Sequence, residues 1–194
     1  MMRLEFMERQ QKLTLCKGGR QALVLLNEKE EKREQETPED EKTEVTVFTY
    51  DATWLDLTKQ HDPVAAAREE VLKNIEAYDT SSAVNGFYLN GMLIPWSKDD
   101  PSSPNVDKRM CLRQNIADKV ALGEENISIW MKGMSFTMPC AQAEMLMRSI
   151  ENYAYECFNV TAAHKKAVSE LTDIAEVLSY DYTKGYPEKL SMMV

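Results

Sequence analysis

Residues 137–190 hold the longest helical pattern in the sequence and read TMPCAQAEMLMRSIENYAYECFNVTAAHKKAVSELTDIAEVLSYDYTKGYPEKL. Its first half repeats apolar residues at steps of three and four, the spacing of one helical face: Ala143, Leu146, Met147, Ile150, Tyr153, Ala154 and Cys157. Pro139 suits a first helical turn, because its missing N–H costs nothing there. Asn159 follows the last apolar residue, and Thr161 is a good N-cap for a second helix. We therefore predict a helical C-terminal third with a break at Asn159.

The rest of the chain divides by composition into three segments. Residues 1–26 have a net charge of +3 and apolar runs on both sides of Gly18-Gly19, which predicts an N-terminal arm with a small hairpin. Residues 27–44 hold nine acids, four bases and no large apolar residue. Such a segment buries too little surface to offset its ordering entropy, so we predict an acidic flexible linker. Residues 45–190 are assigned to one α+β domain.

Turn residues and helix-capping residues mark the boundaries of helices and strands in this domain. Asp62-Pro63 and Ser103-Pro104 are typical of helix starts. Asn90-Gly91 and Lys132-Gly133 each lie between apolar stretches, which is the pattern of a tight hairpin turn. The predicted fold class is α+β, with short antiparallel β-hairpins packed with three main α-helices.

Composition limits the function classes. A net charge of -9 over 194 residues argues against a nucleic-acid-binding role, which needs excess Lys and Arg. No apolar run approaches the roughly 18 residues of a membrane span, so no membrane insertion is expected. The four cysteines form no CxxC pair and are interpreted as reduced thiols. We expect neither a metal nor a cofactor.

Three residues have side chains that could carry catalysis. His61 and His164 belong to no CxxC or HExxH pattern, which makes a zinc site a poor interpretation. Cys140 at a helix start could have a lowered pKa, yet nothing in the sequence pairs it with a base. We therefore predict no catalytic residue. The three tryptophans, Trp54, Trp96 and Trp130, are expected to fill the core.

Five stretches carry a resemblance to a known family. They are residues 84–87 (VNGF), 127–137 (ISIWMKGMSFT), 150–157 (IENYAYEC), 159–164 (NVTAAH) and 180–187 (YDYTKGYP), of which the last two are the most specific. On these stretches the chain resembles a family of bacteriophage and prophage domains of unknown function, the four-three-seven-six family, over roughly residues 65–190. Residues 98–107 are longer and more polar than the family pattern, and the first 45 residues have no counterpart. The resemblance implies a part of a phage tail or of a tail-fibre-associated protein, with no established catalytic residues.

From this resemblance and the missing catalytic set we expect a non-enzymatic bacteriophage structural protein of the tail or adsorption apparatus. It would be located in the virion and made in the bacterial host cytoplasm. Its partners would be other phage structural proteins, and assembly with copies of itself stays open. The alternative is a tail-fibre assembly factor, a chaperone that is absent from the mature particle.

The candidate interface combines an apolar run of the arm with the tyrosines of the tail: Leu23, Val24, Leu25, Leu26, Tyr180, Tyr182 and Tyr186. A lone hairpin cannot bury the apolar run well. The arm therefore either docks on a partner or packs on its own domain as an edge hairpin. The tyrosines either seal the helical layer or cover a neighbouring subunit.

Overall fold

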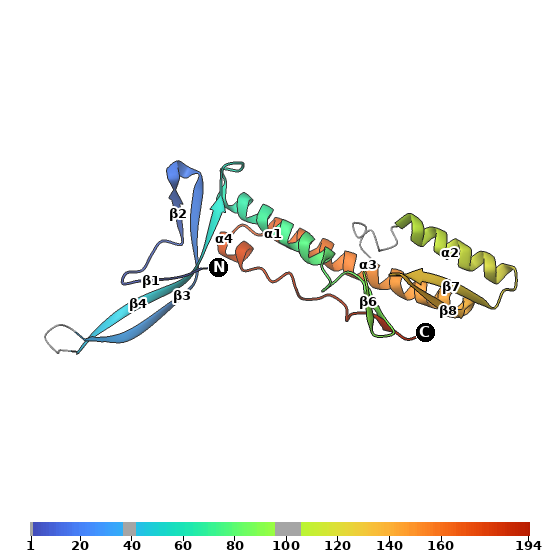
Figure 1. Cartoon of the computed structure of the whole chain (residues 1–194). Coiled ribbons are helices and arrows are strands. Elements are labelled where there is room, and N and C mark those ends of the chain that lie inside the picture. Colours follow the sequence, from blue (N-terminus) through green and yellow to red (C-terminus); the bar gives the residue numbers. More distant parts are fainter. Residues whose placement is uncertain (1, 37–41, 96–105) are drawn as a thin grey trace. The chain divides into compact units, whose positions relative to one another are not determined.

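The computed structural model describes residues 2–36, 42–95 and 106–194, and its fold is α+β (Figure 1). Its strands are β1 (Met2–Phe6), β2 (Leu13–Cys16), β3 (Gln21–Glu36), β4 (Lys42–Asp56), β5 (Phe87–Leu89), β6 (Met92–Ile94), β7 (Asn126–Met131), β8 (Met134–Pro139) and β9 (Ser191–Met192). Its helices are α1 (Pro63–Thr80), α2 (Val106–Ala121), α3 (Cys140–Glu170) and α4 (Ile174–Leu178), with a 3₁₀ turn at Lys17–Gly19. The predicted fold class is confirmed, including three main helices and a helical C-terminal third.

The chain forms two compact units. Unit 1 contains Met1–Leu72 and Ala167–Tyr180, and unit 2 contains Lys73–Lys166 and Asp181–Val194. Helices α1 and α3 each contribute residues to both units. The predicted domain start at residue 45 is wrong, because β4 belongs to the same sheet as β1, β2 and β3.

Unit 1 is built on a four-stranded antiparallel sheet with the order β1-β4-β3-β2. The hairpin predicted across Gly18-Gly19 is confirmed, because β2 pairs with the first residues of β3. Residues on both faces of β3 and β4 are buried, among them the consecutive Val24 and Leu25 of β3 and Leu55 of β4. On the helical side, Arg68 Nε donates to the carbonyl oxygen of Leu171 at 2.9 Å, which ties α1 to the segment after α3.

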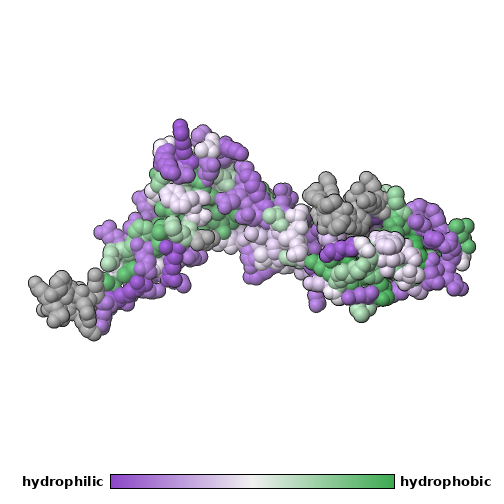
Figure 2. All heavy atoms as spheres, in the orientation of Figure 1, coloured by the Kyte–Doolittle hydropathy of each residue, from purple (hydrophilic) through white to green (hydrophobic). Residues whose placement is uncertain are grey.

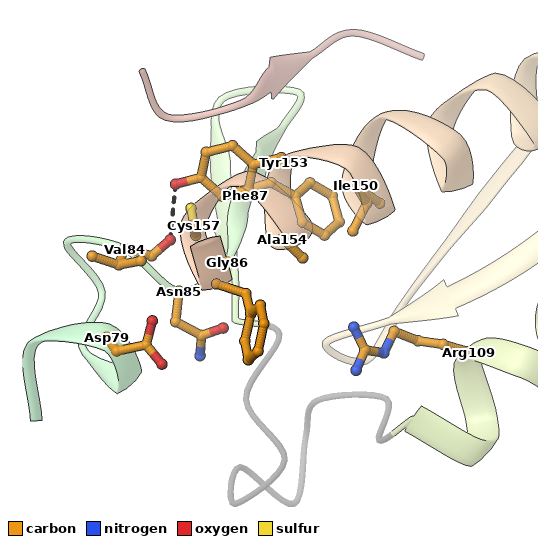
Figure 3. A pocket seen from close by; sticks show the side chains of 11 residues that line it. Asp79, Val84, Asn85, Gly86, Phe87, Arg109, Ile150, Tyr153, Ala154 and Cys157 are labelled. Carbon is orange, nitrogen blue, oxygen red and sulfur yellow. Dashed lines mark hydrogen bonds between the residues drawn. The ribbon is translucent and has the colours of Figure 1, made fainter. Parts of the chain in front are cut away.

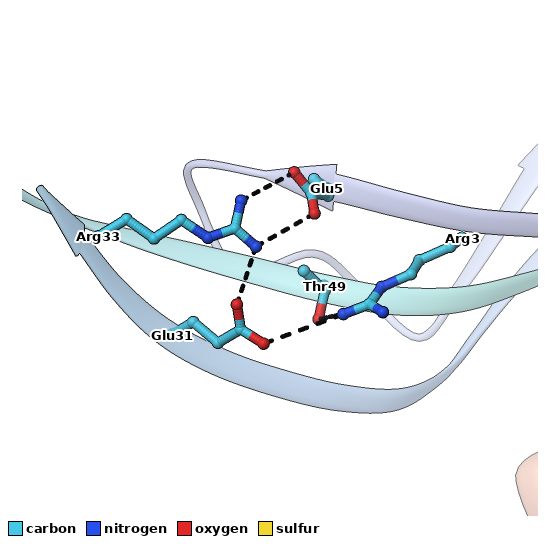
Figure 4. Close-up of polar contacts among 5 residues, drawn as sticks. All are labelled: Arg3, Glu5, Glu31, Arg33 and Thr49. Atoms are coloured by element: carbon cyan, nitrogen blue, oxygen red, sulfur yellow. Dashed lines mark hydrogen bonds and ion pairs between the residues drawn. The ribbon is translucent and has the colours of Figure 1, made fainter. Parts of the chain in front are cut away.

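The described part of the acidic segment, residues 27–36 and 42–44, belongs to a two-stranded ribbon of β3 and β4 instead of a linker. Opposite charges within the sheet compensate one another. Arg33 contacts Glu31 of its own strand at 2.8 Å and Glu5 of β1, on the far side of β4, at 3.3 Å (Figure 4). Lys32 contacts Glu44 of the neighbouring strand β4 at 3.2 Å. The linker prediction is therefore wrong for residues 27–36 and 42–44, since cross-strand pairing orders them without a large apolar core. Residues 37–41 lie outside the described part of the chain.

Unit 2 combines two small sheets with helix α3. One sheet has the order β6-β5-β9, in which β9 runs parallel to β5, and the other is the β7-β8 hairpin. Both predicted hairpin turns are confirmed: Asn90 and Lys132 have a φ of 50°, and the glycines after them have φ of 78° and 77°. Positive φ at both central positions is what a type I′ turn requires. The hairpins and α3 share one core, which includes Ile94, Ile116, Ile129, Leu146 and Ile150.

Helix α3 runs without a break from Cys140 to Glu170, so the predicted break at Asn159 is wrong. Thr161 does not cap a helix, because it lies inside α3. A polar residue in a helix interior costs less than about 1 kcal/mol relative to alanine, so packing of the helix readily overrides the local signal. The short helix α4 is capped by Asp173, whose carboxylate accepts two backbone N–H bonds.

Candidate functional site

The apolar run of the arm is packed inside its own unit. Val24, Leu25 and Leu26 are 0%, 4% and 4% exposed, and Leu23 packs against the same sheet cluster as Leu25. Buried side chains offer no surface to a partner, so the structure contradicts the interface prediction for Val24, Leu25 and Leu26. Leu23 is only partly buried, and its interface role stays a prediction. Of the two alternatives, the arm packs on its own unit, because β3 is an inner strand between β2 and β4.

The tyrosines of the tail contact residues of their own units. Tyr182 and Tyr186 pack edge-on against Tyr78 of α1, with ring centroids 5.9 and 5.5 Å apart. The hydroxyl of Tyr186 also lies 2.9 Å from that of Thr161. Tyr180 is half-buried in unit 1. These contacts anchor the tail on the helices, and a partner-binding role for the tyrosines stays a prediction.

Unit 2 contains a pocket of about 150 Å³ (Figure 3). It lies between the end of α1, the segment that leads into β5, the first turn of α2 and the middle of α3. Ile150 and Ala154 form an apolar wall, while Asp79 and Arg109 lie on opposite sides (Figure 3). Small-molecule sites typically have roughly 300–1,000 Å³. This pocket is smaller than that range and has about the size of one protein side chain.

A hydrogen-bond network holds the wall of the pocket that leads into β5. The Tyr153 hydroxyl donates to the carbonyl oxygen of Val84 at 2.8 Å. Lys189 Nζ donates to the carbonyl oxygens of Asn85 and Gly86 at 3.3 and 3.5 Å. These bonds fasten the segment before β5 to α3 and to the tail. The wall is therefore positioned by side chains from distant parts of the sequence.

Burial governs the ionisation of the groups around the pocket. It raises the pKa of Cys157, with the neighbouring Tyr153 hydroxyl acting in the opposite direction, and it raises the pKa of Tyr153 as well. Both groups keep their protons at neutral pH, and a protonated thiol is a poor nucleophile. Burial lowers the pKa of Arg109, opposed by Glu151, yet a guanidinium stays charged in proteins. The arrangement suits binding better than nucleophilic catalysis.

The residues considered for catalysis have ordinary structural surroundings. His61 is exposed in the loop before α1. His164 Nε2 lies 2.8 Å from the carbonyl oxygen of Lys184, and its ring packs on Tyr186. Cys140 is 3% exposed in the core of unit 2. Among the described residues, no group of three His, Cys, Asp or Glu side chains could hold a metal ion. No helix in that part of the chain is long and apolar enough to cross a membrane.

Large apolar side chains are exposed on unit 2. Leu122, Trp130, Tyr155 and Phe158 have exposed fractions of 76%, 72%, 66% and 64%. Figure 2 shows hydrophobic atoms at the surface of unit 2 over β7 and β8. Tyr155 and Phe158 are three residues apart on α3, so their side chains are neighbours, and Phe158 also lines the pocket. We regard these residues and the pocket as the candidate contact surface.

The core prediction for the tryptophans is wrong in two of three cases. Trp54 is 47% exposed and Trp130 is 72% exposed, while Trp96 lies outside the described residues. The sequence pattern around Trp130 does indicate that its side chain is exposed. Ile127, Ile129 and Met131 alternate toward the core, which turns Trp130 to the other face of the hairpin. Tyr155 and Phe158 likewise do not belong to the set of apolar residues that recurs at helical spacing between Ala143 and Cys157 on α3.

No family model, no curated protein and no solved structure matches this chain. The resemblance to the phage family therefore stays a prediction.

Proposed function

We propose that this chain is a non-enzymatic bacteriophage structural protein of the tail or adsorption apparatus, which acts through contacts with other proteins of the particle. It would be made in the host cytoplasm and retained in the virion. The resemblance of residues 159–164 and 180–187 to phage domains supports the phage assignment.

The observation that carries the contact function is the exposure of large apolar side chains on unit 2. Tryptophan and tyrosine are enriched among the residues that dominate binding energy at protein interfaces. Trp130 stands on the outer face of a two-stranded hairpin, and Tyr155 and Phe158 are adjacent on α3. Exposed groups of this kind are typical of surfaces that another protein covers.

The chemistry of the pocket favours a binding role over an enzymatic one. The thiol of Cys157 and the phenol of Tyr153 both have pKa values raised by burial, so neither is an activated nucleophile. The volume of about 150 Å³ suits a side chain of a partner that reaches past Phe158.

Mass spectrometry of purified virions tests the proposal directly. Peptides of this chain at a stoichiometric level are the expected result. Their absence from mature particles, together with their presence in assembling lysates, would favour the assembly factor and overturn retention in the virion.

A substitution at the contact surface tests the contact itself. Trp130→Ser should leave the free energy of unfolding within about 0.5 kcal/mol, because the side chain is largely exposed. The same variant should lower the yield of complete particles. Leu15→Ser, which removes an exposed apolar side chain from unit 1, is the matched control. Equal particle yields for both variants would count against a contact role for Trp130.

A further inference from the structure

Strand β4 extends beyond the strand that pairs with its outer edge. β1 ends at Phe6, which pairs with Phe48, and β4 continues for six more residues to Lys42. Along those residues β4 has β3 on one side and, within the described chain, no strand on the other. In an antiparallel ladder, alternate residues point their N–H and C=O groups toward each neighbour. The edge at 42–47 therefore presents backbone groups that can receive a further strand.

A groove follows this edge in the line of β1. Its volume is about 270 Å³. Four apolar residues line it, Phe6, Met7, Val45 and Val47, together with three charged residues, Glu5, Arg33 and Glu34. Met7 is 62% exposed, so apolar surface at the mouth faces solvent. Alternate side chains of an added strand would meet this apolar lining. The groove thus combines a backbone edge with a site for side chains.

The charge of the ribbon restricts what can bind there. Residues 27–44 carry nine acids against four bases, a net charge of -5, to which the described residues 27–36 and 42–44 contribute six acids and all four bases. Two of the four bases are paired: Arg33 contacts Glu31 and, on β1, Glu5, and Lys32 contacts Glu44 (Figure 4 shows the Arg33 contacts). Charged edges disfavour pairing with most strands, and an excess of one sign selects a partner of the opposite sign. A second copy of this chain would bring the same acidic ribbon and be repelled.

We propose that the edge of β4 at 42–47 receives an extended basic segment of a partner protein, which adds to the sheet as a strand beyond the end of β1. The segment would alternate apolar residues with Lys or Arg. This inference rests on the proposed contact function and names the class of partner at a second surface, in unit 1. Main-chain hydrogen bonds supply affinity, while the groove and the acidic charge supply specificity.

A peptide of eight residues that alternates valine and lysine is the probe. It is titrated into the full ¹⁵N-labelled chain, and backbone amide shifts are followed by NMR. Shifts centred on Val45, Thr46 and Val47 are expected, and they should weaken as salt rises from about 50 to 500 mM. A valine–glutamate peptide should not bind. A valine–lysine peptide with N-methyl groups at alternate positions should also fail, because it cannot complete the ladder.

Two charge variants of the protein show whether peptide binding depends on charge near the groove or on the net charge of the whole chain. Glu44→Lys should weaken binding of the basic peptide roughly threefold to tenfold, since it reverses a charge beside the groove. Glu70→Lys makes the same change of net charge on α1 and should leave the affinity nearly unchanged. If both variants bind the basic peptide equally more weakly, the effect comes from the net charge of the protein, and the proposed site at β4 is overturned.

Three further results would overturn the proposal. One is equal binding of the N-methylated peptide, which would exclude strand addition. Another is a set of amide shifts confined to the outer edge of β3. A third is a dimer of the chain in sedimentation that is lost in Val45→Pro, which would assign the edge to a second copy. If the peptide does not bind, the strand-addition proposal fails and the virion test of the proposed function is unaffected. If the chain is absent from virions, its retention in the virion is overturned and the peptide result is unaffected. The two hypotheses can therefore fail separately.

Discussion

Replacing Gly86 by alanine should destabilise unit 2 for a reason that the structure locates at one contact. Gly86 precedes β5 and has a φ of +90°, which L side chains rarely adopt. A Cβ atom built there would lie 2.5 Å from the carbonyl oxygen of Ile94 and 3.1 Å from Cα of Pro95. Both neighbours are backbone atoms, so relief requires β5 and β6 to separate.

The size of the effect follows from two contributions. A left-handed conformation costs a residue with a side chain about 1–2 kcal/mol. Overpacking against the β6 backbone adds about 1–3 kcal/mol, for a total of about 2–5 kcal/mol. Gly133 is the matched control, because its φ is +77° and a Cβ there would meet nothing within 4 Å. Gly133→Ala should therefore lower the free energy of unfolding only by the conformational cost of about 1–2 kcal/mol.

Urea unfolding followed by circular dichroism measures both variants. Amide hydrogen exchange in β5 and β6 then reports on unit 2 alone. Losses of unfolding free energy that agree within about 0.5 kcal/mol for Gly86→Ala and Gly133→Ala would contradict a backbone clash at Gly86.

Three further predictions concern other parts of the fold. The Thr183 hydroxyl, with Lys184, lowers the pKa of Asp181 to about 2, so the stabilising effect of this carboxylate is present above its unfolded pKa of about 3.9 and is lost as the pH falls toward 2. In Thr183→Val the Asp181 pKa should rise toward the unfolded value in an NMR carboxyl titration, and an unchanged titration would contradict the assignment. Thr161→Val removes the 2.7 Å bond to Asp79 from a buried site and should cost about 1–3 kcal/mol in urea unfolding, whereas an unaltered midpoint would show that the bond contributes nothing. A chain shortened to residues 45–194 lacks β1, β2 and β3, so the remaining amides of β4 should exchange freely while unit 2 stays protected; protected β4 amides would show that the arm is dispensable.

Local backbone chemistry made several elements predictable. Asp62-Pro63 opens α1, and Asn90-Gly91 and Lys132-Gly133 turn the two hairpins of unit 2. Each signal acts within two to four residues, through a fixed proline φ or a permitted positive φ. Neighbours far away in the sequence cannot easily change such a preference, so it survives in the folded chain.

The ribbon was missed because its ordering is not local. Composition alone favours a solvated linker for residues 27–44. In the fold, Arg33 meets Glu5, 28 residues away, and Val47 is buried opposite Glu31. Those contacts exist only after β1, β3 and β4 have paired.

The fold class, the helical face of α3 and the hairpin turns could be predicted from the amino-acid sequence, because periodicity and turn chemistry act along the chain. Which apolar residues lie at the surface could not be predicted, because that depends on tertiary packing. Val24, Leu25 and Leu26 are buried within unit 1, while Trp130 is exposed on the outer face of its hairpin. Both outcomes have one physical cause. Burial depends on what packs against a face, and the packing partner is supplied by segments far away in the chain.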